Sequence, residues 1–330
     1  MFAPHHFPFL INYFEGIDGF VARKLNRPVP PSETTLTEEF CAMMDAGNQR
    51  AEGLLSYDID ALNRDLSSMG HDINADFRVQ VHQHARGMEA YVSQADFGLI
   101  LELDNRVLPG ESWSEAYLMQ AKRLFAGPSA EGYSLASGFH SATPDQDKRI
   151  EILAEILGED SLKYCLYCPP TTGYESTAVA AVRTVHATRL GRQIFDYGLG
   201  FALHEHVLQT GGIDSGIWVS GSNHSVKTAF DLHNSAFGGS LPFAWFILKH
   251  LRSSSWPIGH DMAPPTKDHG RTKGIATGDP STCQGLISEL GERARKADVS
   301  VENLKVLPAS SVTIRVRIGP AETPLPPPQS

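Results

Sequence analysis

The chain has 330 residues, a formal net charge of −10, 41% hydrophobic residues and 20% charged residues. This composition is typical of a globular protein with one large or two modest domains, and the negative charge argues against a broadly basic nucleic-acid coat. No apolar run approaches the roughly 18 residues that a membrane helix needs, and the N-terminus lacks the basic segment of a secretory signal. Four cysteines are too few for a disulfide scaffold at this length. We therefore expect a cytoplasmic protein without membrane contact.

The first elements are helical. Residues 1–31 are expected to form an N-terminal helical extension, with its helix over residues 9–25. Ser32 follows a Pro-rich segment and predicts the N-cap of a helix that begins at Glu33. Residues 77–83 (FRVQVHQ) then alternate apolar and polar side chains, which is typical of a half-buried strand.

Two apolar runs predict a β-hairpin, namely residues 97–103 (FGLILEL) and residues 116–122 (AYLMQAK). Turn-prone residues separate them. If the turn is centred near Leu108 and Pro109, the start of the first strand lies opposite the end of the second.

Asp96 would then lie beside Gln120. Lys122 would share a face with Gln120, because side chains alternate along a strand. A carboxylate and an amide oxygen suit a hard cation such as Mg2+, and a lysine beside them suits a phosphate. The three residues therefore predict metal-assisted chemistry on a phosphodiester.

A helix and a strand follow the hairpin. Residues 145–157 place apolar side chains on one helical stripe, and Gly158 indicates the end of the helix. Residues 162–168 (LKYCLYC) form a β-prone run that ends at two prolines. Within this run Cys165 and Cys168 could bind zinc, but a reduced and packed pair is favoured.

The remaining chain is expected to form a mainly helical region over residues 171–319 and a disordered Pro-rich tail over residues 320–330. Helices are predicted over residues 175–210, 241–251 and 282–297, strands over 215–219 and 312–318, and a loop or linker over 253–281.

The pattern of Asp96 and Gln120-Ala121-Lys122 resembles the PD-(D/E)XK nuclease superfamily. That family has an Asp at the start of its second core strand and (Asp/Glu)-x-Lys on its third. Gln at the first place of the second motif is similar to the variant seen in Mrr-like restriction enzymes. The order helix, three strands, helix, strand over residues 32–170 also resembles the family core.

The resemblance implies an α/β (α+β) fold with a restriction-endonuclease-like core, a mixed central sheet flanked by helices, and a mainly helical C-terminal region. It also implies a Mg2+-dependent nuclease, with Mn2+ as a substitute, that acts on nucleic acid. DNA is favoured over RNA, and the role is defence against foreign or phage DNA.

By the same resemblance, Asp96 and Gln120 hold the metal and Lys122 serves the nucleophile or the phosphate. The family often adds an acid from the first core helix. Glu33 is favoured, although an acid in a first helical turn also stabilises the helix dipole without any catalytic role. The competing acids are Glu38, Glu39 and Glu89.

Substrate contacts are expected from Gln146, from Arg123 and from Arg189. Gln146 lies on the helix after the hairpin, where the family places a polar residue near the phosphate. Arg189 belongs to a stripe that recurs every three residues, namely Arg183, His186, Arg189 and Arg192. A solvated helix face accounts for this stripe equally well.

A non-enzyme remains the alternative: a nuclease-like protein that has lost cleavage and acts as a nucleic-acid-binding or assembly subunit. Gln120 in place of a carboxylate and the acidic net charge both favour it. A homo-oligomer or a partner defence protein is compatible with either hypothesis.

Overall fold

A computed structural model describes residues 4–68, 73–84, 96–127, 132–139, 144–190, 213–221, 226–251, 270–297 and 308–320. The helices are α1 (Phe7–Ala22), α2 (Glu33–Met44), α3 (Ala46–Glu52), α4 (Ile59–Ser68), α5 (Pro144–Leu157), α6 (Ser176–Leu190), α8 (Ala229–Asn234), α9 (Phe243–Leu251), α10 (Gly270–Thr277) and α11 (Pro280–Lys296). Short 3-10 helices are η1 (Pro4–His6), η2 (Arg23–Asn26), η4 (Pro109–Glu111), η5 (Glu159–Ser161) and η6 (Thr171–Gly173).

The strands are β1 (Ile73–Gln83), β2 (Phe97–Asn105), β3 (Trp113–Phe125), β4 (Gly138–Phe139), β5 (Leu162–Tyr167), β6 (Ile217–Gly221), β7 (Ser240–Pro242) and β8 (Ser310–Pro320). In the described part of the chain they form one eight-stranded sheet in the order β1-β8-β2-β3-β5-β6-β7, with β4 paired to β3. The β8–β2 and β3–β5 pairs are parallel and the other pairs are antiparallel. The expected mixed central sheet flanked by helices is confirmed.

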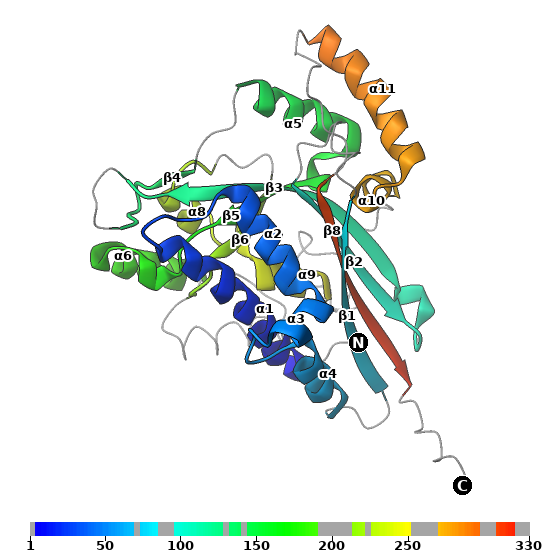
Figure 1. Cartoon of the computed structure of the whole chain (residues 1–330), viewed down its shortest axis with the longest axis horizontal. Helices are drawn as coiled ribbons and strands as arrows, with labels where there is room; N and C mark the ends of the chain where they lie inside the picture. The colour runs from blue at the N-terminus through cyan, green and yellow to red at the C-terminus, as the bar shows by residue number, and fades with distance from the viewer. Residues whose placement is uncertain are drawn as a thin grey trace.

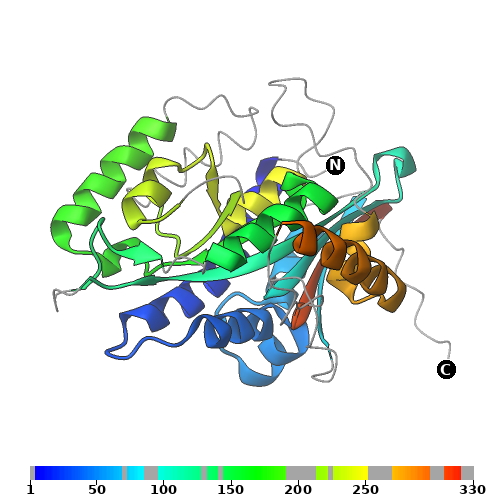
Figure 2. The ribbon, with the colours of Figure 1, turned by 90° about the horizontal axis from the view of Figure 1, so that it is seen from above.

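Helices cover both faces of the sheet (Figures 1 and 2). On one face the larger core joins α1, α2, α4 and α9 to the strands, with Phe14, Phe40 and Phe243 at its centre. On the other face a smaller core joins Ile100 and Leu118 to apolar side chains of α5, α10 and α11. In Figure 1, α5 and α11 lie above the sheet and α1 to α4 lie below it.

The predicted hairpin is confirmed in its register. Phe97 pairs with Met119 and Leu103 pairs with Trp113, so the turn is centred on residue 108 as expected. Side chains on β3 alternate between the two cores, since Tyr117 belongs to the larger core and Leu118 to the smaller.

The predicted start of α2 and the predicted end of α5 are also confirmed. Ser32 is the N-cap of α2, and its hydroxyl accepts the Thr35 N–H at 3.2 Å. α5 ends before Gly158, whose φ of 93° suits glycine. Cys165 and Cys168 are buried free thiols, as favoured. None of the helices in the described part of the chain has the length and apolar character that crossing a membrane requires.

The position of β8 was not anticipated. The strand itself is confirmed, but it lies between β1 and β2, in the middle of the sheet. β6 and β7 also extend this sheet. One sheet therefore crosses the expected boundary at residue 170, because three of its strands come from the region that was expected to be mainly helical.

The expected loop over residues 253–281 is wrong for residues 270–277, which form α10. This short sequence has a weak helical pattern, and its helix is stabilised by packing. Ile275 and Ala276 are fully buried in the smaller core. A Cβ on Gly98 would lie 2.7 Å from the Ala276 carbonyl oxygen, so a glycine on β2 lets α10 approach the sheet this closely.

Candidate active site

The candidate site lies where β3 continues past the start of β2. The Asp96 N–H donates to the Met119 carbonyl at 2.8 Å, and the Ala309 N–H donates to the Asp96 carbonyl at 3.2 Å. The backbone of Asp96 is therefore fixed from both sides, by β3 and by the residue before β8. In this register Asp96 lies opposite Gln120.

The side chains of Asp96 and Gln120 meet. One carboxylate oxygen of Asp96, Oδ2, accepts the Gln120 amide (Nε2) at 2.7 Å and the backbone N–H of Ala121 at 2.7 Å. Hydrogen bonds to an ionised acceptor are among the stronger ones in proteins. Asp96 therefore closes the edge of β3 with its side chain at the point where β2 no longer pairs with it.

The other amide atom of Gln120 lacks a partner. Its Oε1 is buried, and no hydrogen-bond donor in the described part of the chain reaches it. Covalent geometry keeps this oxygen within about 5 Å of Asp96 Oδ2. A buried carbonyl oxygen without a donor is costly, and a hard cation would satisfy it together with the carboxylate. The Asp96 carboxylate and the Gln120 amide oxygen are therefore suitable ligands for Mg2+.

Lys122 lies two residues further along β3 and so projects on the same side of the sheet as Gln120. Its side chain is only 9% exposed. Within the described residues its ammonium group has no hydrogen-bond or ion-pair partner. The stem of Lys122 is buried, but its ammonium group reaches the surface without a counter-charge from the described residues, which suits an anionic ligand at this position.

Glu33 reaches the same edge of β3 from the first turn of α2. Its Oε1 accepts the backbone N–H of Arg123 at 3.0 Å. The N–H groups of Ala121 and Arg123 point to one edge of the strand and are about 6.6 Å apart. The carboxylates of Asp96 and Glu33 therefore lie next to each other along the edge of β3.

The other acids expected to compete with Glu33 lie elsewhere. Glu38 is exposed on α2. Glu39 forms an ion pair with Lys24 at 2.7 Å. Glu89 falls outside the described residues.

Arg123 holds the chain before α2 onto β3. Its Nη1 donates to the carbonyl oxygens of Pro30 at 3.0 Å and Pro31 at 2.6 Å, and its guanidinium lies over the Phe125 ring at 4.0 Å. We expected this side chain to bind substrate. In the structure it fixes the segment that carries Glu33.

The other expected substrate contacts are not brought to this edge. Arg189 lies on α6, where its Nη2 donates to the Asn234 side chain at 2.9 Å. No described contact joins it to Asp96 or Lys122. Gln146 belongs to α5, and its side chain lies outside the described residues.

The expected cationic stripe on α6 is wrong at His186. This residue is fully buried against Trp218, and its Nε2 lies 3.2 Å from Nδ1 of His233. Burial lowers the pKa of His186 to about 4, so the imidazole is neutral near pH 7. The three-residue spacing had suggested one surface, but the helix turns His186 inward. Arg192 lies outside the described residues.

Cys41, whose pKa responds to the charge of Asp96, was not anticipated from the sequence. Its thiol is buried in α2. Burial, and then the charges of Glu38 and Asp96, raise the pKa of Cys41 to about 12. The thiol is therefore inert at neutral pH. Local patterns could not have indicated this proximity of charge, since it depends on how α2 packs on the sheet.

No protein-family model matches the chain, and no curated protein and no solved structure is detectably similar to it. In the parts of the chain that the structure describes, no three His, Cys, Asp or Glu side chains gather closely enough to hold a metal ion. The candidate ligand set is therefore two carboxylates and one amide.

Proposed function

We propose that this protein is a metal-dependent nuclease of the PD-(D/E)XK type, which hydrolyses phosphodiester bonds of DNA in defence against foreign or phage DNA. The observation that carries the proposal is the contact between Asp96 and Gln120 at 2.7 Å, with Lys122 on the same side of the sheet. Glu33, on the adjacent N–H of β3, supplies a further acid.

The order of α2, β1, β2, β3, α5 and β5 along the chain supports a restriction-endonuclease-like core. In this proposal β8 is an addition to that core, inserted between its first and second strands. A cytoplasmic location, and action as a homo-oligomer or with a partner defence protein, belong to the same proposal.

Asp96, Gln120 and Glu33 would hold Mg2+, for which Mn2+ can substitute. The bound metal would lower the pKa of a water molecule and offset the negative charge that develops on the phosphate. Lys122 brings a positive charge to the phosphate or holds the attacking water by donating to it. Arg123 does not touch the substrate in this scheme, because it fixes the segment that carries Glu33.

The test is cleavage of plasmid and oligonucleotide DNA with Mg2+ or Mn2+ by the wild type, Asp96→Ala and Lys122→Ala. We expect each substitution to lower the rate about a hundredfold or more. Equal residual activity in all three proteins would indicate a contaminating nuclease and reject the proposal. Glu33→Gln should also lower the rate, whereas Glu38→Gln, an exposed change on the same helix, should not.

One observation favours the second candidate, a nuclease-like protein without cleavage activity. The Gln120 amide nitrogen donates to Asp96 Oδ2, so these two atoms already pair with each other without any metal. Gln120→Glu distinguishes the two functions. In a metal site it adds a negative charge and should raise Mg2+ affinity about tenfold or more, a gain of about 1.4 kcal/mol. In a site that never binds metal, titration calorimetry should detect no Mg2+ binding to the wild type.

A further inference from the structure

The strands β1, β8 and β2 carry a polar surface opposite the larger core. Phe77, Leu101 and Val316 point into that core, so their neighbours in sequence point to the other side of the sheet. We name this surface the arginine face. It consists of Arg78, Arg106, Lys273, Arg315 and Arg317 together with Asp76, Glu102 and Asp104.

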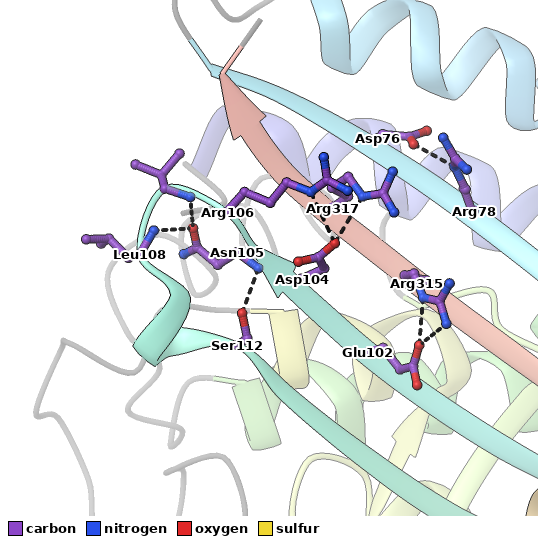
Figure 3. A network of polar contacts seen from close by, with 11 residues as sticks. Asp76, Arg78, Glu102, Asp104, Asn105, Arg106, Leu108, Ser112, Arg315 and Arg317 are labelled. Carbon is purple, nitrogen blue, oxygen red and sulfur yellow. Dashed lines mark hydrogen bonds and ion pairs between the residues drawn. The ribbon is translucent and has the colours of Figure 1, made fainter. Parts of the chain in front are cut away.

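Carboxylates of β2 hold Arg315 and Arg317 of β8 across the strands, whereas Asp76 pairs with Arg78 within β1 (Figure 3). Arg315 donates to Glu102 through Nε at 2.7 Å and Nη2 at 2.6 Å. Arg317 donates to Asp104 through Nε at 3.0 Å. The guanidinium groups are therefore fixed in direction before any ligand arrives, which reduces the entropy lost on binding.

Among the described residues of this surface, cations outnumber carboxylates. Glu102 serves both Arg315 and Lys273, and Asp104 serves both Arg317 and Arg106. Each of these two carboxylates therefore leaves one positive charge unbalanced. The excess is notable because the whole chain carries a net charge of −10.

The cations are also accessible. The side chains of Arg78 and Arg106 are 57% and 51% exposed. Arg78 and Arg317 bind their carboxylates through Nε, so their Nη donors are not used in these contacts. An arginine with unused, outward donors is suited to phosphate oxygens.

Gln120 and Lys122 of the candidate site alternate with Met119 and Ala121 of the larger core, so they project to the same side of the sheet as the arginine face, whereas Glu33 approaches from α2 on the other side. Asp96 directly precedes β2, and Glu102 and Asp104 lie further along that strand. Six residues separate Asp96 from Glu102, a distance of about 20 Å along β2. At 3.4 Å per base pair this corresponds to about six base pairs of duplex DNA.

We infer that the arginine face binds the phosphate backbone of the DNA substrate, about six base pairs from the bond that is cut. This inference rests on the proposed nuclease function. α10 lies over Gly98 between the two sites and contributes Lys273 to the face, so the backbone would pass alongside this helix. If these ion pairs only kept the sheet face soluble, equal numbers of cations and carboxylates would be enough.

The test measures DNA binding without cleavage, with the wild-type chain in EDTA. A labelled duplex of about 30 base pairs, roughly 100 Å long, is titrated and its fluorescence anisotropy recorded over a range of KCl concentrations. We expect Arg78→Gln with Arg106→Gln to weaken binding about tenfold and to reduce the salt slope by about 1.8, the value for two lost phosphate contacts.

A second variant acts in the opposite direction. Asp76→Asn with Asp104→Asn removes two negative charges from the face and should tighten binding by a similar factor. Misfolding cannot produce this gain. The matched control is the ion pair of Arg50 and Asp60, which is also exposed, at 2.7 Å, but lies on α3 and α4. Arg50→Gln and Asp60→Asn should leave DNA binding unchanged.

Failure of this inference can be told apart from failure of the nuclease proposal. If the wild type cleaves DNA with Mg2+ while all four changes on the arginine face leave affinity and salt slope unaltered, the inference is overturned and the nuclease remains. If the variants alter binding as expected but no cleavage occurs, only the nuclease is rejected. A wild type that does not bind the duplex overturns the inference directly.

Discussion

Lys122 and Arg123 are neighbours on β3, but their side chains differ in the partners that the fold provides. Arg123 has two carbonyl acceptors and an aromatic ring beneath it. Lys122 is 9% exposed and has no partner in the described part of the chain. Its ammonium group reaches the surface from a buried stem and makes no ion pair with a described residue, so the fold alone gives no reason for a lysine here. Such a local conflict is typical of a residue retained for function.

This contrast makes a prediction for stability. Lys122→Met keeps an apolar stem of similar length and removes an unpaired charge, so the free energy of unfolding should stay within about 1 kcal/mol of the wild type or rise, while DNA cleavage is lost. Arg123→Met is the control on the same strand, and it should lower the free energy of unfolding by about 1.5–3 kcal/mol because two charge-assisted hydrogen bonds disappear. Urea denaturation measures both. A destabilised Lys122→Met would mean that the ammonium group has a structural partner.

The sequence predicted part of the candidate site. The apolar runs and the turn residues were enough to align Asp96 with Gln120, because a hairpin register depends on a short stretch of chain. The burial of Lys122 and the contact of Arg123 with Pro30 depend on how α2 packs across the sheet. No local pattern carries that information.

The hairpin is also held by an element that the sequence does not place next to it. α10 packs against β2 at Gly98, and Lys273 of α10 reaches Glu102 at 2.7 Å and the Ser114 hydroxyl at 2.9 Å. One helix therefore binds both strands of the hairpin. Its distance of more than 150 residues along the chain explains why the sequence indicated only a loop.

Gly98→Ala tests this packing. The new Cβ would lie 2.7 Å from a backbone oxygen and 2.8 Å from the Cα of Ala276, so α10 must shift. We expect the free energy of unfolding to fall by about 1–3 kcal/mol, and hydrogen exchange in α10 to accelerate. Gly110→Ala, in the hairpin turn, is the matched control, since no atom of the described residues lies within 4 Å of a Cβ at this position. Equal stability of the two variants would mean that α10 is not packed closely on β2.

β8 shows the limit of strand prediction from a local pattern. The alternation of Val312, Ile314, Val316 and Ile318 with polar residues indicated the strand. Alternation says that one face is buried, and it says nothing about which strands lie on either side. The nearest partners of β8 begin at residues 73 and 97, so its central place comes from long-range pairing.

At the scale of the whole molecule, buried ionisable groups set the response to pH. Burial lowers the pKa of His186 to about 4 and that of His233 to about 3, and burial also lowers the pKa of His6 to about 4. In the unfolded chain these imidazoles have an ordinary pKa near 6.5 and take up protons first as the pH falls. Their contribution to stability is present above pH 6.5 and is lost as the pH falls toward 4.

Asp18 has the opposite effect on the pH dependence of stability. Its carboxylate is buried beneath β6, where it accepts hydrogen bonds from Ser215, Gly216 and Ile217, and burial raises its pKa to about 7 in spite of them. Because the folded state binds this proton more tightly, its contribution is present below about pH 4 and is lost as the pH rises to 7. Asp18 lowers the slope of the free energy of unfolding against pH, and the three histidines raise it. Because the histidines are more numerous, the slope between pH 4 and pH 6.5 should be positive.

We therefore expect the free energy of unfolding to rise between about pH 4 and pH 6.5, with each unopposed proton worth about 1.4 kcal/mol per pH unit. Urea denaturation at several pH values measures the slope. His186→Gln should flatten it and Asp18→Asn should steepen it, whatever each substitution does to stability at a single pH. Gln83→Asn, an exposed change on β1 that does not titrate, is the control and should leave the slope unchanged. A wild-type slope of the opposite sign would mean that Asp18 outweighs the buried histidines.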